Sequence, residues 1–316
     1  MRSLYLSTVS LITLFATAAA AEAPVDEILV TARGRTEILQ DIPDSVTVLS
    51  RDDLRLREVR TIDDVLALTP GVHMVNDQDP GTNIVTVRGI TTDRLQAPSI
   101  AYVIDGVSLA DTEFFTGRFF DMERVEILKG PQGALYGKNA IGGVINVTTR
   151  APSAEWEGNA EIGYGNGDTV ELEGGIGGPI IADKLLFRVA GAFHETDGFI
   201  HNRFLDRKVD HFTSRNLRAR FLGLLGENFT ADLRFNYMNE EGGAAYISSN
   251  NVTGLHHGRL SGAALTDPIG DFEGAADREW KNLSLKLDWG IGGGTLTSIS
   301  AYDDYHKDFV EEFDFR

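Results

Sequence analysis

The sequence predicts a compact α+β unit of a little over a hundred residues, followed by long antiparallel strands typical of a transmembrane β-barrel. Three observations predict this fold. A glycine-rich segment flanked by two β-branched runs ends the first part, and strict alternation of apolar and polar residues follows it. The connections between the later strands are short at one end and long at the other.

The first 21 residues have the pattern of a cleaved secretory signal. Arg2 precedes an apolar run, and small residues ending at Ala19, Ala20 and Ala21 form an Ala-x-Ala cleavage site. The apolar run is too short to span a bilayer permanently. Pro24 and acidic residues follow, which disfavours the alternative of a retained membrane anchor. We therefore expect residues 1–21 to be removed on export.

The composition excludes several classes of function. The 316-residue chain has a formal net charge of -18, so it lacks the basic stripes that nucleic acid requires, and no nucleic-acid partner is expected. The absence of cysteine excludes disulfides, thiolate metal sites and cysteine catalysis. Two classes remain open, an ordinary secreted β protein and a transmembrane barrel.

Residues 22–38 form a short polar stretch around Ile28, Leu29 and Val30. A lone extended segment of this kind cannot bury itself, so we expect it to be mobile until a partner offers a sheet edge. The alternative is that it forms the first strand of the folded domain.

Residues 39–152 alternate short strands and short helices. Ser50 with Asp53, and Thr61 with Asp64, have the spacing of capping boxes that open helices. Strands are expected at 45–49, 72–75, 84–88 and 100–104, with Asp105 and Gly106 as a turn after the last of them.

Residues 125–150, VEILKGPQGALYGKNAIGGVINVTTR, predict a strand, a glycine-rich excursion and a second strand. Glycine at this density indicates positive φ or close backbone packing. A phosphate-binding loop is excluded, because three residues separate Gly133 from Gly137 and Asn139 follows Lys138. A loose surface loop is disfavoured by the apolar residues among the glycines, which we expect to be buried: Leu135, Tyr136, Ile141, Val144 and Ile145.

From residue 153 onward the pattern has period two. Strands are expected at 156–165, 169–176, 184–194, 215–225, 228–238, 279–289 and 295–305. In the fifth of these, Phe229, Leu233 and Phe235 share one face while Asp232 and Arg234 share the other. The connections fit short periplasmic turns and long external loops, with 166–168 as the exception. Aromatic residues near strand ends suit interfacial girdles: Trp156, Tyr164, Tyr237, Trp280, Trp289, Tyr302 and Tyr305.

Local strings in the first part carry a family resemblance. VRGI at 87–90, YVIDGV at 102–107 and RVEILKGP at 124–131 occur in this order, and the last of them runs into the glycine-rich segment. Together with the signal they resemble the TonB-dependent outer-membrane receptors, over essentially the whole mature length. The resemblance implies a plug domain at 39–152 and the N-terminal portion of a barrel at 153–316. It also implies that residues 22–38 contain the TonB box: Asp26, Glu27, Ile28, Leu29, Val30, Thr31 and Ala32.

The resemblance implies active transport of a scarce ligand across the outer membrane, with the plug gating the barrel. The implied partners are TonB, outer-membrane lipid and a small external ligand. A ferric siderophore is the commonest cargo of the family; cobalamin, haem, other metal complexes and glycans are also used, and no residue here discriminates. In the family, charged groups of the plug core hold the plug against the barrel wall. The implied plug-core and gating residues are Arg88, Gly89, Asp105, Gly106, Arg124, Glu126, Gly130, Gly133, Gly137, Gly142 and Gly143.

No catalytic, cofactor or metal site is expected. His256 and His257 are adjacent but lack a third ligand, and the acidic stretch from Asp303 lacks the spacing of a calcium loop. Neither Gly-x-Ser-x-Gly nor His-Glu-x-x-His occurs, so an enzyme is disfavoured. The rival to transport is a secreted adhesin or binding module with a half-exposed sheet. About seven strands are expected where plugged transporters have about 22, so we expect the chain to be a fragment, ending in or just past a strand at Arg316.

Overall fold

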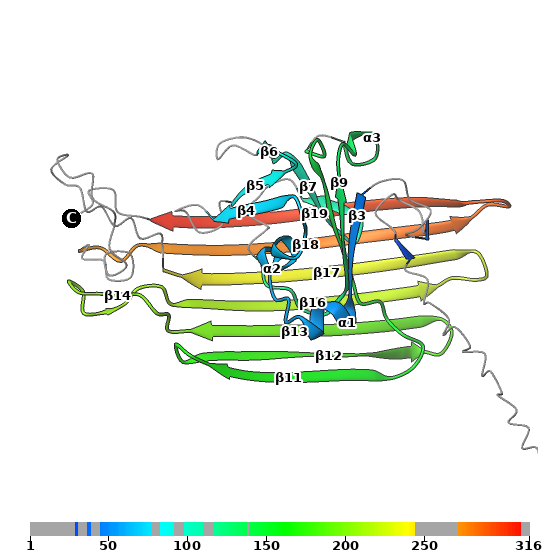
Figure 1. The fold of residues 1–316 in the computed structure, drawn as a ribbon. Coiled ribbons are helices and arrows are strands. Elements are labelled where there is room, and N and C mark those ends of the chain that lie inside the picture. Colours follow the sequence, from blue (N-terminus) through cyan, green and yellow to red (C-terminus); the bar gives the residue numbers. More distant parts are fainter. Residues whose placement is uncertain are drawn as a thin grey trace, which may run out of the picture.

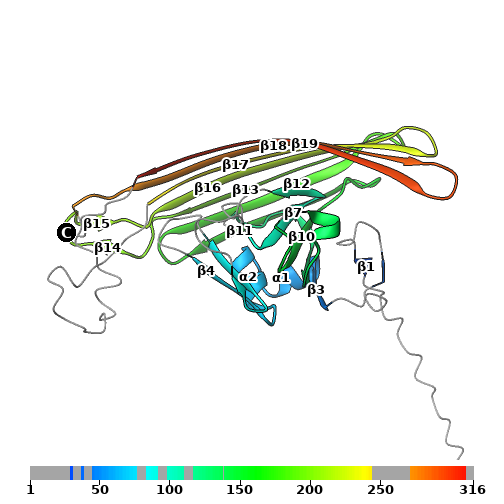
Figure 2. The same cartoon turned by 90° about the horizontal axis from the view of Figure 1, so that it is seen from above.

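The computed structural model describes residues 29–30, 37–38, 45–76, 83–91, 98–109, 117–137, 139–243 and 271–310. The predicted signal peptide, the His256–His257 pair and Arg316 lie outside these residues, as do Asp26, Glu27, Ile28, Thr31 and Ala32 of the predicted TonB box. A seven-stranded antiparallel sheet forms one layer, and an α+β unit lies against one face of it (Figures 1 and 2). The predicted fold class is confirmed.

The α+β unit is built around a mixed five-stranded sheet. Its strand order is β3-β9-β10-β7-β8, with β10 parallel to β7 and every other pair antiparallel. A second sheet has the order β4-β5-β6. The elements are β3 (Ser45–Ser50), α1 (Arg51–Leu56), α2 (Ile62–Ala67), β4 (Val72–Asn76), β5 (Asn83–Val87), β6 (Ile90–Thr91), β7 (Ile100–Ile104), β8 (Val107–Leu109), β9 (Met122–Lys129), α3 (Gly133–Tyr136) and β10 (Gly143–Thr149).

Both predicted capping boxes are confirmed. The side chain of Ser50 accepts from the N–H of Asp53, the Asp53 carboxylate accepts from the Ser50 N–H, and Thr61 and Asp64 repeat the arrangement. Side-chain and backbone hydrogen bonds from Ser50 hold the pKa of Asp53 below its ordinary value. Such short helices depend on their caps, because one turn leaves most of its backbone N–H groups without partners inside the helix.

The glycine-rich segment has the predicted strand, excursion and strand. β9 and β10 pair antiparallel from Lys129↔Gly143 onward, and α3 occupies the excursion. Val144 and Ile145 are fully buried, as predicted. The prediction was wrong for Leu135 and Ile141, which are 57% and 62% exposed. Both flank the end of the β9–β10 pair, where α3 projects away from the core (Figure 1).

The glycines of this segment serve two purposes. Gly142 and Gly143 are buried in close backbone contact, and Gly142 donates its N–H to the carbonyl of Ser99. Close packing is the wrong explanation for Gly133 and Gly137, which are exposed and have nothing within 4 Å of an added Cβ. Gly137 instead has a φ of 72°, which glycine adopts without strain.

We expect Gly143→Ala to destabilise the α+β unit by about 1–3 kcal/mol or more. The added Cβ would lie 2.3 Å from the carbonyl oxygen of Leu128, at a φ of 158°, so β9 and β10 would have to separate. Gly133→Ala is the matched control, because its Cβ enters open space. Protection of the unit from protease in the full-length protein checks this; equal protection of the two variants would contradict it.

The second layer is the wall, a sheet in which each strand is antiparallel to the next. It consists of β11 (Glu157–Gly165), β12 (Thr169–Ile181), β13 (Leu185–Thr196), β16 (Phe212–Leu224), β17 (Phe229–Gly242), β18 (Ala275–Gly290) and β19 (Thr295–Val310). All seven predicted strands are confirmed, with some shifted ends. Short connections meet at one end, while the long connection after β13 carries a hairpin, β14 (His201–Asn202) and β15 (Arg207–Lys208), at the other (Figure 1).

The two faces of the wall reverse the arrangement of a soluble sheet. The face toward the α+β unit buries polar and charged side chains: Arg188, Arg218, Arg220, Asp232, Arg234 and Asn282. The opposite face exposes apolar side chains: Leu172, Ile176, Leu217, Phe221, Leu233 and Leu283. An exposed apolar face of this extent suits lipid, as in a transmembrane barrel, and disfavours a soluble one-sided sheet. Among the described residues, no helix has the length and apolarity needed to cross a bilayer.

The aromatic girdle stays a prediction, which the exposure of four of its seven residues supports. Trp156, Tyr164, Trp289 and Tyr302 are exposed on the wall. Trp280 and Tyr305 were wrongly assigned, because both pack against the core of the α+β unit. Both side chains lie on the face of their strands that carries the polar residues.

The N-terminal segment stands apart from the other sheets. β1 (Leu29–Val30) pairs antiparallel with β2 (Glu37–Ile38), and these two strands form a sheet of their own. The alternative in which this segment is the first strand of the α+β sheet is therefore wrong.

Candidate functional site: the interface between the α+β unit and the wall

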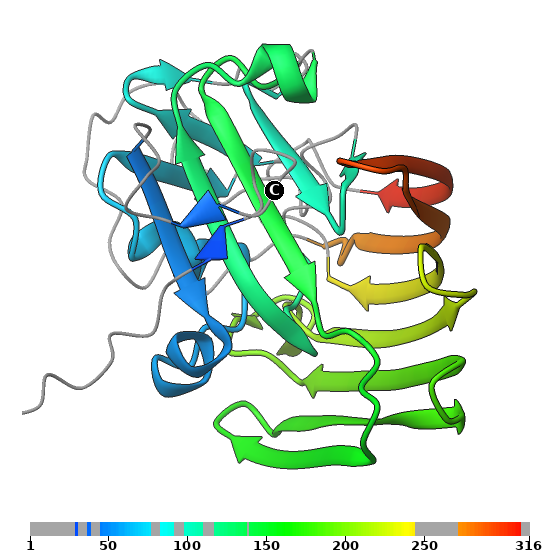
Figure 3. The same cartoon turned by 90° about the vertical axis from the view of Figure 1, so that its right-hand side faces the viewer.

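The wall lies along one side of the α+β unit (Figure 3). Charged side chains of the two layers contact each other across this interface. Inward-facing positions recur every second residue along each wall strand. The side chains that line this interface come from β11, β12, β13, β16 and β17 of the wall, and from the turns and strand ends of the α+β unit.

The first cluster joins the start of β9 to β13. The Nε of Arg188 donates to Asp121 at 2.7 Å, and a second guanidinium nitrogen also contacts this carboxylate. Arg150, just after β10, donates to Glu157 at 2.8 Å and lies 3.7 Å from Asp121. The side chains of Arg188 and Asp121 are 1% and 2% exposed. Two arginines and two carboxylates therefore neutralise one another; the Arg188–Asp121 pair is nearly closed to water, while Glu157 is 36% exposed.

The second cluster joins the β7–β8 turn to β16 and β17. Arg234 donates to the backbone carbonyl of Asp105 at 2.6 Å and to Asp232 at 2.6 Å, and Arg220 donates to Asp232 at 2.7 Å. The Asp105 carboxylate accepts from the N–H and hydroxyl of Thr149 at 2.9 and 2.6 Å. Burial alone would raise the pKa of Asp105, but Arg234, Arg220 and the Thr149 bonds outweigh it and hold this pKa below its ordinary value.

Between these clusters, Arg218 reaches from β16 to the segment that precedes β9. Its guanidinium donates to the backbone carbonyl of Phe120 at 3.0 Å and lies 4.4 Å from the centre of the Phe120 ring. Buried ion pairs gain little net stability over apolar packing, yet removing one partner costs about 3–5 kcal/mol. The charged contacts therefore favour one alignment of the α+β unit on the wall. Removing a single charged residue is expected to lower the stability of the interface strongly.

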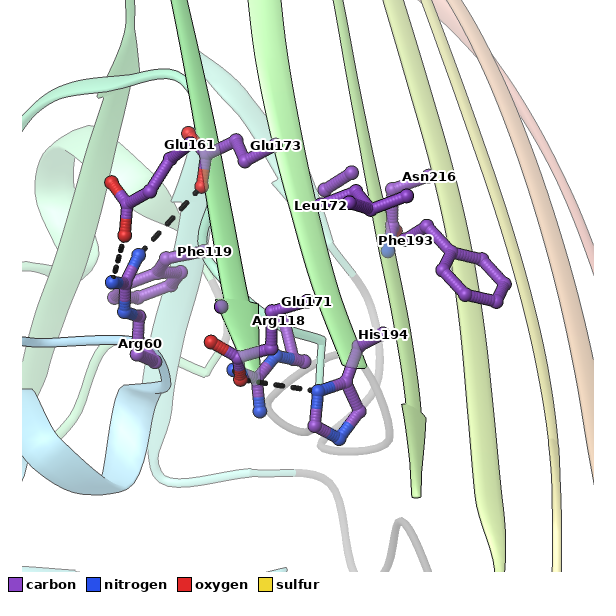
Figure 4. Close-up of a pocket in the computed structure, with 12 residues that line it drawn as sticks. Arg60, Arg118, Phe119, Glu161, Glu171, Leu172, Glu173, Phe193, His194 and Asn216 are labelled. Atoms are coloured by element: carbon purple, nitrogen blue, oxygen red, sulfur yellow. Dashed lines mark hydrogen bonds and ion pairs between the residues drawn. The ribbon is translucent and has the colours of Figure 1, made fainter. Parts of the chain in front are cut away.

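A third cluster lines a pocket toward the ends of β12 and β13 that adjoin the long connection after β13 (Figure 4). Arg60, from the α1–α2 connection, pairs with Glu161 and lies 3.9 Å from Glu173. Arg118 pairs with Glu171, whose carboxylate is also 3.2 Å from the Nδ1 of His194. The Arg60 and Glu161 side chains are 34% and 54% exposed, in contrast to the buried first cluster.

The predicted charged plug-core residues are only partly where they were expected. Glu126 is fully buried and accepts from Arg124 at 2.7 Å and from Asn146 at 2.9 Å. These bonds lie within the α+β unit rather than across to the wall. Arg88 was wrongly placed in the core, because Arg88 and Gly89 form the exposed β5–β6 turn, with φ of 49° and 84°. Asp105 was correctly identified as a turn residue.

The remaining predicted glycines are turn and strand-end positions. Gly106 follows Asp105 in the β7–β8 turn with a φ of 87°, and Gly130 comes directly after β9 with a φ of 119°. Both need backbone conformations that glycine adopts freely. Neither is part of the charged clusters.

Sequence reasoning missed most residues of the interface, including Arg60, Asp121, Arg150, Arg188 and Arg220. The signal was present, because period-two alternation already put charged residues on one face of the wall strands. Their partners in the α+β unit carried no motif. In the part of the chain that the structure describes, no three His, Cys, Asp or Glu residues gather as a metal site would require.

Comparisons with known proteins cover both the α+β unit and the wall. The family model of the TonB-dependent Receptor Plug Domain matches residues 38–144. The chain is 29% identical over 210 residues to the iron-regulated outer membrane virulence protein of Vibrio cholerae, covering 60% of this chain and 31% of that protein. It is 27% identical over 257 residues to the vitamin B12 transporter BtuB of Vibrio vulnificus, covering 77% and 41%.

Among solved structures, the chain is similar to the ferric yersiniabactin uptake receptor FyuA from Yersinia pestis. The TM-score is 0.75 at 21% sequence identity, over 84% of this chain and 41% of that chain. That likeness shows the fold. The chain spans less than half the length of each of these three proteins.

Proposed function

The chain belongs to the TonB-dependent outer-membrane receptor family, and from that premise we propose that it is the N-terminal part of a transporter that imports a scarce ligand across the outer membrane. In this proposal, residues 1–21 direct export and residues 22–38 contain the TonB contact. Residues 39–152 are the plug, and residues 153–316 begin the barrel whose lumen the plug fills.

The observation that carries this proposal is the reversed wall. Its buried face is charged and paired to the plug, while its other face is apolar and exposed. A barrel in lipid needs the apolar face outside, and a plugged lumen needs polar groups inside. A secreted adhesin in water would bury the apolar face instead. The names of relatives as receptors and transporters further support transport over catalysis.

The proposed cargo is an iron chelate. Relatives include an iron-regulated virulence protein and the ferripyoverdine receptor of Pseudomonas aeruginosa, and a similar structure is that of a ferric yersiniabactin receptor. The vitamin B12 transporter among the relatives supports cobalamin as the second candidate. TonB is the proposed energising partner, with Asp26 to Ala32 as its contact.

The full-length protein, expressed in cells that lack their own receptors, tests this function. We expect labelled iron, supplied as ferric yersiniabactin or ferripyoverdine, to accumulate when TonB is present and not when TonB is deleted. Labelled vitamin B12 serves as the parallel probe. Uptake of vitamin B12 without uptake of iron would overturn the proposal that the cargo is an iron chelate. Accumulation of both labels in the absence of TonB would overturn the proposed TonB-dependent transport. Expression that fails to rise under iron starvation would also count against iron.

A further inference from the structure

The outward face of the wall, which points away from the plug, carries an uncharged band. Its edge toward the long connections can be followed from strand to strand, because outward positions recur every second residue. The last apolar or aromatic outward residues before a charged side chain or an amide are Val170 on β12, Phe193 on β13, Leu217 on β16, Tyr237 on β17, Leu283 on β18 and Tyr302 on β19. Because β13, β16, β17 and β18 each pair with a strand on both sides, they do not form a sheet edge (Figure 1).

The edge of the band runs obliquely across the strands. The register row of Tyr302 passes through Leu283, Phe235, Ala219, Val189 and Ile176. On β12 the band nevertheless continues past Ile176 to Val170, six residues further toward the long connections. Six residues span about 20 Å along a strand and the five strand spacings about 24 Å across the sheet, so the edge is inclined by about 40° to the register rows. Strands of membrane barrels tilt by about 35–45°, so this edge is level with a bilayer surface.

Two cations lie immediately beyond the edge on β16 and β18. Arg215 is the next outward residue after Leu217, and Lys281 is the next after Leu283. Lys281 is in register with Tyr237, whereas Arg215 is in register with the residue two positions further along β17. The slope of the edge offsets this difference, so the two cations lie at the same level, with Tyr237 on the strand between them.

Each cation is held by a partner that also lies beyond the edge. Arg215 donates to Glu241 at 3.0 Å and to Asn239 at 2.9 Å, and Lys281 pairs with Glu279. The Arg215 and Lys281 side chains are 50% and 48% exposed. Because a guanidinium has five N–H groups and an ammonium has three, both cations keep donors for a further ligand.

Apolar side chains adjoin the two cations on the other side, toward the short turns. Leu217 and Leu283 are 43% and 49% exposed, and Phe235, the next outward residue after Tyr237, is 36% exposed. Tyrosine is enriched where a membrane protein passes from hydrocarbon to headgroups. The site therefore joins two phosphate-binding side chains to a surface suited to acyl chains.

We propose that Arg215 and Lys281 bind the phosphate of an anionic lipid in the outer leaflet, whose acyl chains lie on the apolar band. The proposal rests on the proposed transport function, because it requires the outward face of the wall to stand in the membrane. Arginine and lysine are the side chains that bind phosphate in proteins, and charge-assisted hydrogen bonds of this kind are strong. The lipid would be held on the outside of the wall, apart from the plug and from the cargo.

Native mass spectrometry of the full-length protein in a neutral detergent tests this site, with phosphatidylglycerol and phosphatidylcholine as the probes. We expect the protein to retain phosphatidylglycerol in preference, and Arg215→Ala combined with Lys281→Ala to lower that retention several-fold. Arg207→Ala combined with Lys208→Ala is the matched control, with the same change in charge on the exposed β14–β15 hairpin. Equal losses in the two double variants, or equal retention of the two lipids by the unmodified protein, would overturn the proposal.

A gain of binding separates the site from general damage to the wall. Asp304 is in register with Lys281, so its carboxylate would repel a bound phosphate. Asp304→Asn is therefore expected to raise the retention of phosphatidylglycerol, and unchanged or lower retention would count against the site. Glycerol 3-phosphate, which lacks acyl chains, is expected not to displace the lipid at equal concentration; displacement would show a site for free anions instead. These measurements need neither TonB nor a cargo, so their failure is distinct from failure of the uptake assay.

Discussion

Replacing Arg188 by alanine is expected to loosen the plug from the wall by about 3–5 kcal/mol. The guanidinium is 1% exposed and holds Asp121 through two of its nitrogens, so its removal leaves a buried carboxylate that Arg150, at 3.7 Å, compensates only in part. The measurement is hydrogen-exchange protection of the β9 and β10 amides in the full-length protein, which reports the free energy of opening this region.

The matched control for Arg188 is Arg215→Ala. Arg215 also lies on a wall strand and pairs with an acid, Glu241, at 3.0 Å, but both side chains are about half exposed. Its removal is expected to cost less than about 1 kcal/mol. Replacing Arg188 by Met and Asp121 by Leu together is expected to cost less than Arg188→Ala alone, because no unpaired charge remains buried. Equal protection loss in the Arg188 and Arg215 variants would contradict the buried-pair account.

Replacing Leu29 by proline is expected to abolish energised uptake while leaving ligand binding at the cell surface intact. In the proposed TonB contact, strand addition would use backbone N–H groups of residues 26–32, and proline has none to donate. Leu29 pairs with Ile38 in a two-stranded sheet separate from the plug sheets, so the change leaves the plug core in place.

The control for Leu29 is Leu29→Ala, which keeps the N–H and is expected to retain most of the uptake. Binding and accumulation of ferric yersiniabactin or ferripyoverdine are measured separately for the two variants. Normal accumulation in the proline variant would refute the assignment of the TonB contact to this segment.

The sequence predicted features that depend on local patterns. Ser50 and Thr61 were identifiable as caps because the hydrogen bonds they make span three residues, and Asp105 with Gly106 marked a turn for a similarly local reason. Period-two alternation located the wall strands and their charged face. The apolar run before Arg88 also suggested a strand, but it ended one residue sooner because Arg88 and Gly89 make the turn.

The charged interface could not be predicted in the same way. Asp121 and Arg188 are 67 residues apart in the chain, and Asp105 and Arg234 are 129 apart. Their meeting depends on the register of the wall strands and on how the plug is turned inside them. The period-two pattern shows on which face of the sheet a charged side chain lies, but it does not show which oppositely charged residue that side chain contacts. Arg60 gave no signal at all, because exposed arginines near helix ends are common on any surface.

The reversed wall also bears on how such a chain reaches its membrane. Because polar residues and glycines interrupt the apolar residues of every wall strand, no strand of the wall is a continuous apolar run of the ~20 residues that a membrane-spanning helix needs. The mean hydropathy of the whole chain is accordingly only -0.13. The apolar surface that lipid requires emerges only when the strands pair and all the outward side chains come together. In the proposed transporter, the alternation that puts arginines against the plug would also let the unfolded protein pass through one bilayer and insert into the next.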